Sequence, residues 1–236
     1  MKFDPLIGTK FEAEAIAPIL NVKPLMGLEA TENAIKQVKS PEILHIATHG
    51  FFLEDVETSS PSDSSRDGLI LESDFGLQAL AFRAVENPLL RSGIALAGAN
   101  IRQSGTEDGI MTALEIANLN LAGTKLVVLS ACETGIGEVK VGEGVYGLRR
   151  ALGLAGSESQ VISLWRVDDA GTQELMTKYY ERVLNNQEGR SEALRQVQLG
   201  MLENWIYQHP YYWASFMPSG EWEGMGSQKS EVRSQK

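Results

Sequence analysis

The sequence predicts an α/β protein in which helices cover both faces of a mainly parallel sheet. Short, nearly continuous apolar runs alternate along the chain with longer segments whose apolar residues recur at helical spacing. Such runs are typical of strands that are buried on both faces, between two layers of helices. With 236 residues, of which 43% are hydrophobic, the chain is long enough for one compact domain with a sizeable core.

The amino-terminal third predicts two strands separated by a helix. The first strand covers residues 22–27, and Thr31 can cap the helix that follows it. Residues 42–49 form the second strand. Residues 54–67 are polar, rich in serine and interrupted by Pro61, so we expect a flexible polar loop at the tip of a hairpin.

The middle of the chain predicts two further helices and a strand between them. A helix over about 112–118 leads into an apolar strand over residues 125–132, which ends on Cys132. A glycine-rich segment follows this strand. Residues 145–156 then show helical spacing, with Gly156 as the residue that stops the helix.

The carboxyl-terminal third predicts a buried strand, two helices and a weak final strand. The buried strand covers residues 160–167, and the final one covers 213–220. Pro218 cannot donate to a ladder, which is typical of an edge strand. Residues 224–236 are polar and are expected to form a disordered tail. The two helices cover residues 169–184 and 191–205, with Asp168 or Asp169 capping the first and Ser191 capping the second.

Charge and composition exclude several classes of protein. The formal net charge of -10 argues against nucleic acid as a partner, because affinity for phosphates depends on Lys and Arg. No apolar run approaches the about 20 residues that cross a bilayer, and the start lacks the profile of a signal peptide. We therefore expect a cytoplasmic protein without membrane contact. His45, His49 and His209 lack zinc-ligand spacing, so neither a metal nor another cofactor is expected.

The strongest candidates for chemistry are His49 and Cys132, each of which ends a predicted strand. In a parallel sheet the carboxyl ends of neighbouring strands meet at one edge, so the imidazole and the thiol can form a base and nucleophile pair. The alternative for Cys132 is an inert, buried small residue, and for His49 a hydrogen bond to the backbone. His45 lies within the same strand and is expected to be a core imidazole.

Gly50 follows His49, and two roles are possible for it. Its N–H can form one half of an oxyanion hole, with the N–H of Cys132 as the other half, or it is an ordinary turn glycine. The glycines after Cys132 lack the Gly-Lys-Ser/Thr ending of a phosphate loop, so a flexible loop beside the nucleophile is the simpler interpretation. The histidine precedes the cysteine, as in caspase-type peptidases.

Six ordered blocks of the sequence together resemble the CHAT domain, a caspase-like family that is related to the separases. They include "ILHIATHGFF", "LVVLSACETGIGEVKVGEGVYGLRRA" and "VISLWRVDD". The resemblance covers roughly residues 5–223. The blocks span residues 43–52, 87–100, 107–121, 126–151, 161–169 and 209–216.

The resemblance implies a caspase-haemoglobinase sandwich of three layers, α/β/α. It also implies that His49 is the general base, Cys132 the nucleophile and Gly50 an oxyanion donor. Domains of this family are commonly fused to tetratricopeptide or other repeat modules and, in bacteria, are implicated in the regulated cleavage of partner proteins. The upstream half that such domains usually carry is apparently missing, which predicts an exposed sheet edge and self-association or a regulatory partner.

The resemblance also directs attention to a substrate pocket. Ser130, two residues before the cysteine, takes a position that is acidic in relatives that cut after Arg or Lys, so a basic preference is not supported there. Glu133, Asp168 and Asp169 can supply negative charge, although the two aspartates are also ordinary helix caps. Trp165 either walls the pocket or belongs to the core.

Two functions of different classes follow from these observations. The leading hypothesis is a cysteine endopeptidase that cleaves a protein or peptide substrate through His49 and Cys132. The alternative is a non-catalytic CHAT module that acts as a scaffold in a bacterial signalling system.

Overall fold

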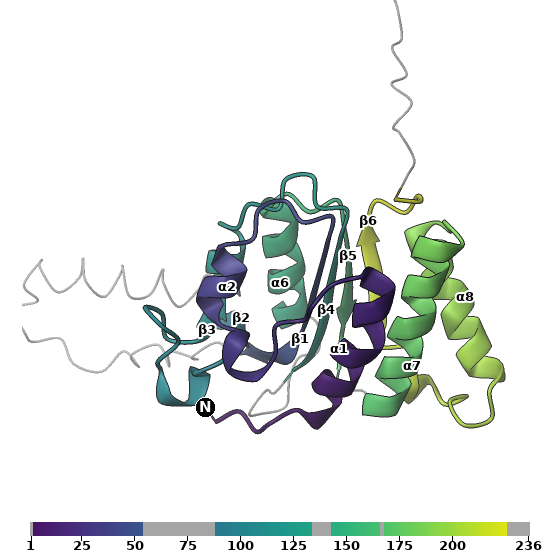
Figure 1. The fold of residues 1–236 in the computed structure, drawn as a ribbon, viewed down its shortest axis with the longest axis horizontal. Helices are drawn as coiled ribbons and strands as arrows, with labels where there is room; N and C mark the ends of the chain where they lie inside the picture. The colour runs from purple at the N-terminus through teal and green to yellow at the C-terminus, as the bar shows by residue number, and fades with distance from the viewer. Residues whose placement is uncertain (1, 54–87, 134–142, 166–167, 226–236) are drawn as a thin grey trace, which may run out of the picture.

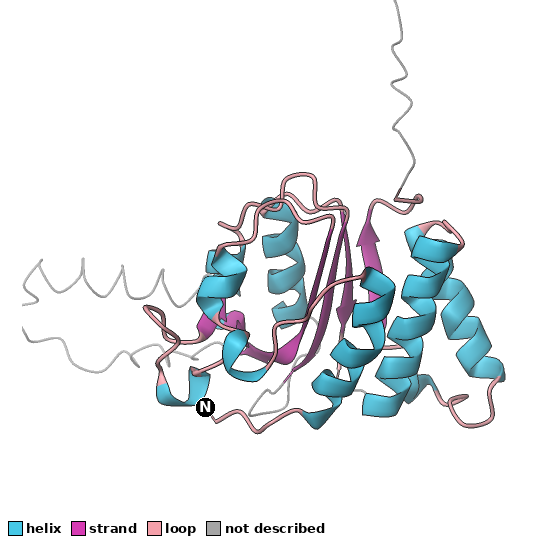
Figure 2. Cartoon of the chain, in the orientation of Figure 1, coloured by secondary structure: helices cyan, strands magenta, loops and turns pink. Residues whose placement is uncertain are grey.

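An open sheet of six strands lies between two layers of helices in the computed structural model, which describes residues 2–53, 88–133, 143–165 and 168–225 (Figures 1 and 2). The strand order is β3-β2-β1-β4-β5-β6. The strands are β1 (Ile43–Phe52), β2 (Ser92–Ala95), β3 (Ile110–Thr112), β4 (Leu126–Glu133), β5 (Ser159–Ser163) and β6 (Phe216–Gly220). The predicted α/β class is confirmed.

The helices differ in length, and the longer ones flank the centre of the sheet. The principal helices are α1 (Ile7–Leu20), α2 (Glu32–Lys36), α4 (Pro88–Arg91), α5 (Ala113–Ile116), α6 (Glu143–Leu154), α7 (Asp169–Tyr180) and α8 (Arg190–Glu203). Short turns of other helix types are η1 (Gly27–Glu29), η2 (Ala99–Ile101), η3 (Glu181–Asn185) and η4 (Pro210–Tyr212).

Each face of the sheet has its own hydrophobic core. On one face, β4 and β5 pack against α1, α7 and α8 through residues such as Val128, Leu175 and Leu194. On the other face, Val127 and Leu129 pack against α5 and α6. Buried strand residues therefore alternate between two helical layers, which is why β4 reads as a continuous apolar run.

The sheet is mixed, so the prediction of a mainly parallel sheet is wrong. Only the central pairs, β1 with β4 and β4 with β5, are parallel, whereas β1 with β2, β2 with β3 and β5 with β6 are antiparallel. The strands β2 and β3 have four and three residues, which is too short to show a hydrophobic period. The predicted edge strand is confirmed as β6, in which Pro218 lies opposite Val161.

The predicted strand over residues 22–27 is absent. This segment pairs with no strand in the described part of the chain, and Pro24 has no N–H to donate. Its Leu25 side chain is 57% exposed. The helix before it, α1, was not predicted, since exposed Ile7 and the internal Pro18 interrupt its apolar pattern.

The predicted capping residues are confirmed for α2 and α7 but not for α8. The Thr31 side chain caps α2 by accepting from the Ala34 N–H, and Asp168 caps α7 by accepting from the Gly171 N–H. By contrast, α8 begins at Arg190 with Gly189 at its cap position, so Ser191 is not the cap. Arg190 is the first helical residue, and its buried guanidinium donates to the Lys125 carbonyl.

Other segments are shorter than expected or lie outside the described residues. The predicted helix over 112–118 is α5, with Thr112 as its cap in a capping box. The predicted strand over 160–167 ends at Ser163, which places Trp165 after β5. The loop over residues 54–67 and most of the tail lie outside the described residues.

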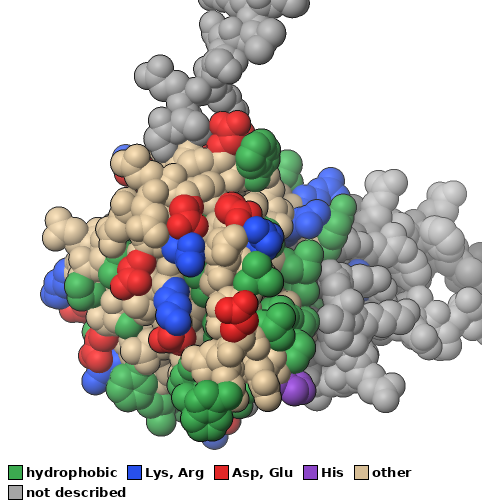
Figure 3. Space-filling view, turned by 90° about the vertical axis from the view of Figure 1, so that its right-hand side faces the viewer, with side chains coloured by type: hydrophobic (Ala, Val, Ile, Leu, Met, Phe, Trp, Pro, Cys, Tyr) green, Lys and Arg blue, Asp and Glu red, His purple; other side chains and the backbone are tan. Residues whose placement is uncertain are grey.

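Exposed hydrophobic side chains gather at one end of the face that is formed by α7 and α8 (Figure 3). The exposed hydrophobic residues include Leu202 on α8, and Trp205 and Ile206 in the turn that follows it. Over the described ranges, no helix is long and apolar enough to span a membrane.

A charged cluster joins α2 to the far edge of the sheet. The Lys36 ammonium lies 2.8 Å from Glu32, 3.1 Å from Glu107 and 3.2 Å from Glu115. Glu32 is 1% exposed and also accepts from the Gly109 N–H. Burial disfavours the Lys36 cation, but its hydrogen bonds to the three carboxylates outweigh this and raise its pKa. These carboxylates are close enough together to hold a metal ion, but the Lys36 ammonium already lies among them and offsets one of their charges.

We predict that Lys36→Met destabilises the protein by about 3 kcal/mol, because it leaves the buried Glu32 carboxylate without its counter-charge. Lys10→Met is the matched control. Lys10 and Glu14 form an exposed pair at 3.7 Å, whose loss is expected to cost less than about 0.5 kcal/mol. The measurement is the free energy of unfolding in urea. Equal effects of the two substitutions would contradict the prediction.

Candidate functional site

The two candidate catalytic residues lie directly opposite each other on the central pair of strands. The parallel register of β1 and β4 runs without interruption from Ile43 opposite Leu126 to Gly50 opposite Glu133, and it places His49 opposite Cys132. Neighbouring strands are about 4.8 Å apart, and residues in register share one face of the sheet. For Cys132 and Glu133 the structure describes the backbone.

His49 does not end its strand, contrary to the prediction. β1 continues to Phe52, because β2 pairs antiparallel with its last four residues, from His49 opposite Ala95 to Phe52 opposite Ser92. Gly50 is therefore inside a strand and has a neighbour on each side rather than starting a turn. The glycine belongs to the sheet itself.

The backbone just before Cys132 is held by a side chain where the ladder with β5 stops. The register of β4 with β5 covers only Val127 to Leu129. Beyond it, the buried Ser163 hydroxyl accepts from the Ala131 N–H at 3.0 Å and donates to the Ala131 carbonyl at 2.7 Å. Ser163 thus fixes the end of β4, a role that the sequence did not indicate.

The amino-terminal segment lies against His49. The Nε2 atom of His49 is 2.6 Å from the Asp4 carbonyl oxygen, which can only accept, so Nε2 carries the proton and donates. The Phe3 ring contacts the imidazole with 5.5 Å between centroids. The Nδ1 atom is buried, and no described residue is hydrogen-bonded to it. This segment approaches the sheet just before α1 begins (Figure 1).

A buried polar network lies on the same face of the sheet as His49. The Glu12 carboxylate, on α1, accepts from His45 Nε2 at 3.1 Å and from the Ser130 hydroxyl at 3.1 Å. The Tyr180 hydroxyl lies 2.8 Å from His45 Nδ1. Burial raises the pKa of Tyr180 well above its usual range, so its proton is available to the imidazole. His45 is thereby a satisfied core imidazole, as predicted.

Glu12 is the residue that sequence reasoning missed in this network. It is 3% exposed, and α1 buries Gly8, Glu12 and Ile16, which are spaced four residues apart. That spacing is the signal that could have placed Glu12 on the buried face of the helix. Since both of its oxygens are hydrogen-bonded, the carboxylate serves the interior rather than a ligand.

The predicted pocket residues have separate partners in the structure, and for Glu133 only the backbone is described. Ser130 points its hydroxyl at Glu12, and half-buried Trp165 packs against the core beside α7. Asp168 caps α7. The Asp169 side chain occupies the space above Gly8, where an added Cβ would lie 2.0 Å from its Cγ. The alternatives of helix cap and core residue are thus observed for Asp168 and Trp165.

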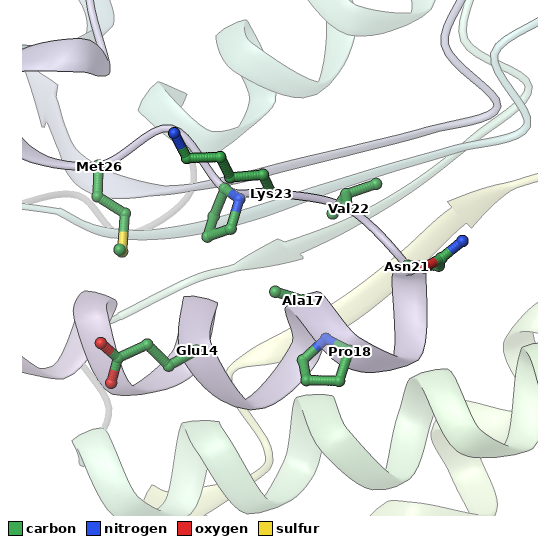
Figure 4. A pocket seen from close by; sticks show the side chains of 8 residues that line it. Glu14, Ala17, Pro18, Asn21, Val22, Lys23 and Met26 are labelled. Atoms are coloured by element: carbon green, nitrogen blue, oxygen red, sulfur yellow. The ribbon is translucent and has the colours of Figure 1, made fainter.

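A surface hollow between α1 and the segment after it is separate from these residues (Figure 4). None of the predicted site residues lines it. Its lining consists of Glu14, Ala17, Pro18, Asn21, Val22, Lys23, Pro24 and Met26. Its lining contains neither a cysteine nor a histidine, so it lacks both residue types of the predicted pair.

The profile of the CHAT domain matches residues 1–221, almost the whole chain. The chain belongs to the CHAT domain family. The resemblance inferred from six short blocks is therefore confirmed. A mixed six-stranded sheet between helical layers is consistent with a caspase-like CHAT fold.

This CHAT domain is also similar to a part of much longer proteins. It is 27% identical over 218 residues to human tetratricopeptide repeat protein 28 and 25% identical over 216 residues to its mouse counterpart. These alignments cover 92% and 90% of the CHAT domain. In each case it spans only 8% of the length of the relative. Both relatives are named for tetratricopeptide repeats.

We predict that Tyr180→Phe destabilises this CHAT domain by about 1 to 2 kcal/mol, because it leaves His45 Nδ1 buried without its partner. Tyr179→Phe is the matched control. The Tyr179 hydroxyl is buried, and no described residue is hydrogen-bonded to it, so its removal is expected to be neutral or slightly stabilising. Chemical denaturation of both variants measures the difference. A larger loss for Tyr179→Phe would show that the network is not structural.

Proposed function

We propose that this CHAT domain is a cysteine endopeptidase of caspase-like type. The observation that carries the proposal is the register that pairs His49 with Cys132 on neighbouring parallel strands. Two adjacent positions on one face of a sheet are close enough for a histidine to take a proton from a thiol. Because the pair is built on the two central strands, its separation is fixed by the sheet rather than by loops.

In the proposed mechanism, His49 accepts the thiol proton of Cys132, and the thiolate attacks the carbonyl carbon of a peptide bond. The carbon–nitrogen bond then breaks as the imidazolium returns the proton to the leaving amine. Water hydrolyses the thioester and restores the thiol. The N–H groups of Cys132 and Gly50 are the proposed donors to the oxyanion. Gly50 lies between β2 and β4, where the N–H groups of a sheet point toward neighbouring strands, which argues against its share of this role.

Substrate recognition and regulation extend the same proposal. The substrate is a protein or peptide, and Ser130, Glu133 and Trp165 stay candidates for its pocket. The Glu12 carboxylate beside Ser130 is engaged by two hydrogen bonds, which argues against a free negative charge for a basic side chain. A tetratricopeptide module, fused or separate, is the proposed regulator, given the names of the similar proteins.

A second candidate is the non-catalytic interaction module. It is favoured by the exposed hydrophobic side chains of Leu202, Trp205 and Ile206, which offer a surface to a partner protein. The Asp4 contact does not separate the two functions, because a proton on His49 Nε2 leaves the lone pair on Nδ1 to accept from a thiol.

The test is the rate at which Cys132 reacts with iodoacetamide between about pH 5 and 9. If the pair is assembled, the wild-type thiol reacts fast near pH 7, and His49→Ala slows it by about tenfold or more, because the thiolate fraction at that pH falls. The control is His209→Ala, which changes a histidine that caps the short helix η4 and is expected to leave the rate unchanged.

The same comparison is made in the Phe3→Ala chain, where the segment over His49 has lost its aromatic contact. Dependence of the rate on His49 in either chain supports the peptidase. If His49→Ala leaves the reaction rate unchanged in both chains, the proposed dyad is overturned and the interaction module is favoured.

A further inference from the structure

The strands β4 and β5 separate just before Cys132. Their parallel register ends with Leu129 opposite Ile162. Ser163, the next residue of β5, pairs with β6 and, among the described strands, with no residue of β4. β4 itself continues through Cys132 to Glu133 with β1 as its neighbour. The residues of β4 that lead to Cys132 thus have a described strand on one side only.

A single side chain takes the place of a strand on the other side. The Ser163 hydroxyl accepts from the Ala131 N–H at 3.0 Å and donates to the Ala131 carbonyl at 2.7 Å. A neighbouring strand supplies the same acceptor and donor from its backbone. Ser163 is 3% exposed and Ala131 is 6% exposed, so both groups are shielded from bulk water. The two hydrogen bonds therefore satisfy backbone groups that would otherwise be buried without partners.

The hydrogen bond to the Ala131 carbonyl also acts on Cys132. This carbonyl and the Cys132 N–H belong to one peptide unit, which is planar. Holding the carbonyl therefore restricts the orientation of the Cys132 backbone, which sets the direction in which the side chain leaves the strand. The preceding residue, Ser130, is held by another element, because its hydroxyl donates to Glu12 of α1 at 3.1 Å. The two residues before Cys132 are thus each fixed by a side chain of a different element.

We propose that Ser163 is a positioning residue for Cys132, one that sets the direction of the thiol relative to His49. The inference rests on the proposed peptidase function and deepens it, because it assigns a role in that reaction to a strand that carries neither member of the pair. Displacing a reacting group by about 1 Å can lower a rate about 100-fold. A serine that only stabilises the fold would leave the response of the thiol to His49 unchanged.

The test is whether removal of the Ser163 hydroxyl makes Cys132 independent of His49. The rate of alkylation of Cys132 by iodoacetamide at about pH 7 is measured in the wild type, His49→Ala, Ser163→Ala and the double variant. If Ser163 positions the thiol, His49→Ala slows the reaction about tenfold in the wild-type background but about threefold or less in the Ser163→Ala background. Circular dichroism and urea unfolding establish that each chain is folded under the conditions of the assay.

Ser159 supplies a matched control at the other end of β5. It is also 3% exposed, and its hydroxyl donates to the Lys125 carbonyl at 2.7 Å, the same distance as from Ser163 to its carbonyl acceptor. Lys125 directly precedes β4, so Ser159→Ala removes an equivalent hydrogen bond at the end of the strand away from Cys132. We expect this variant to lose a similar amount of stability and to keep the full effect of His49→Ala, about tenfold.

If Ser163→Ala does not fold, Ser163→Cys takes its place, because a thiol is a weaker donor and acceptor than a hydroxyl. Peptide mass mapping then separates alkylation at position 132 from alkylation at position 163. In this background the effect of His49→Ala is expected to be about twofold or more below its effect in the wild type.

An equal effect of His49→Ala in the wild type and in the Ser163 variant would overturn the positioning role and leave the peptidase proposal intact. Loss of the effect in Ser159→Ala as well would also overturn that role, because any destabilisation of β5 would then suffice. A wild-type thiol that does not respond to His49 would overturn the dyad and the positioning role together.

Discussion

The parallel ladder between β1 and β4 is the constraint on which the rest of the structure depends. It joins eight residue pairs in one uninterrupted register, from Ile43 opposite Leu126 to Gly50 opposite Glu133. A slip of one residue would turn every side chain of one strand to the opposite face, exchanging the two hydrophobic cores. The same register that separates the cores also sets His49 beside Cys132, so the fold and the candidate chemistry have one physical origin.

Polar contacts around this ladder fix two features that the hydrophobic cores do not: the position of α1 and the end of β4. Ser163 replaces a missing partner strand for Ala131, and Glu12 connects α1 to both β1 and β4 through His45 and Ser130. Buried hydrogen bonds of this kind contribute little to net stability when made, but they are costly to break singly. They therefore fix the position of α1 and the end of β4 more than they add to the free energy of folding.

The amino-terminal segment extends this frame to His49. Asn100 holds the backbone of Phe3, and the Phe3 ring packs against Phe51, which brings the Asp4 carbonyl to His49 Nε2. Because Nε2 donates there, the lone pair of the imidazole is on Nδ1. The segment therefore fixes the tautomer and the orientation of the ring from outside the sheet.

The sequence by itself determined the helical layers, the buried central strands and the choice of His49 and Cys132 as candidates, because apolar runs and caps are local signals. The register that sets His49 opposite Cys132 follows from the pairing of β1 with β4 in the sheet. Only the tertiary structure decided the directions of the outer strands, the extension of β1 through Gly50 and the contacts of Glu12 and Phe3. These features join residues far apart in the chain: Phe3 and Asn100 are 97 positions apart. Such contacts follow from how the elements pack, which local patterns do not specify.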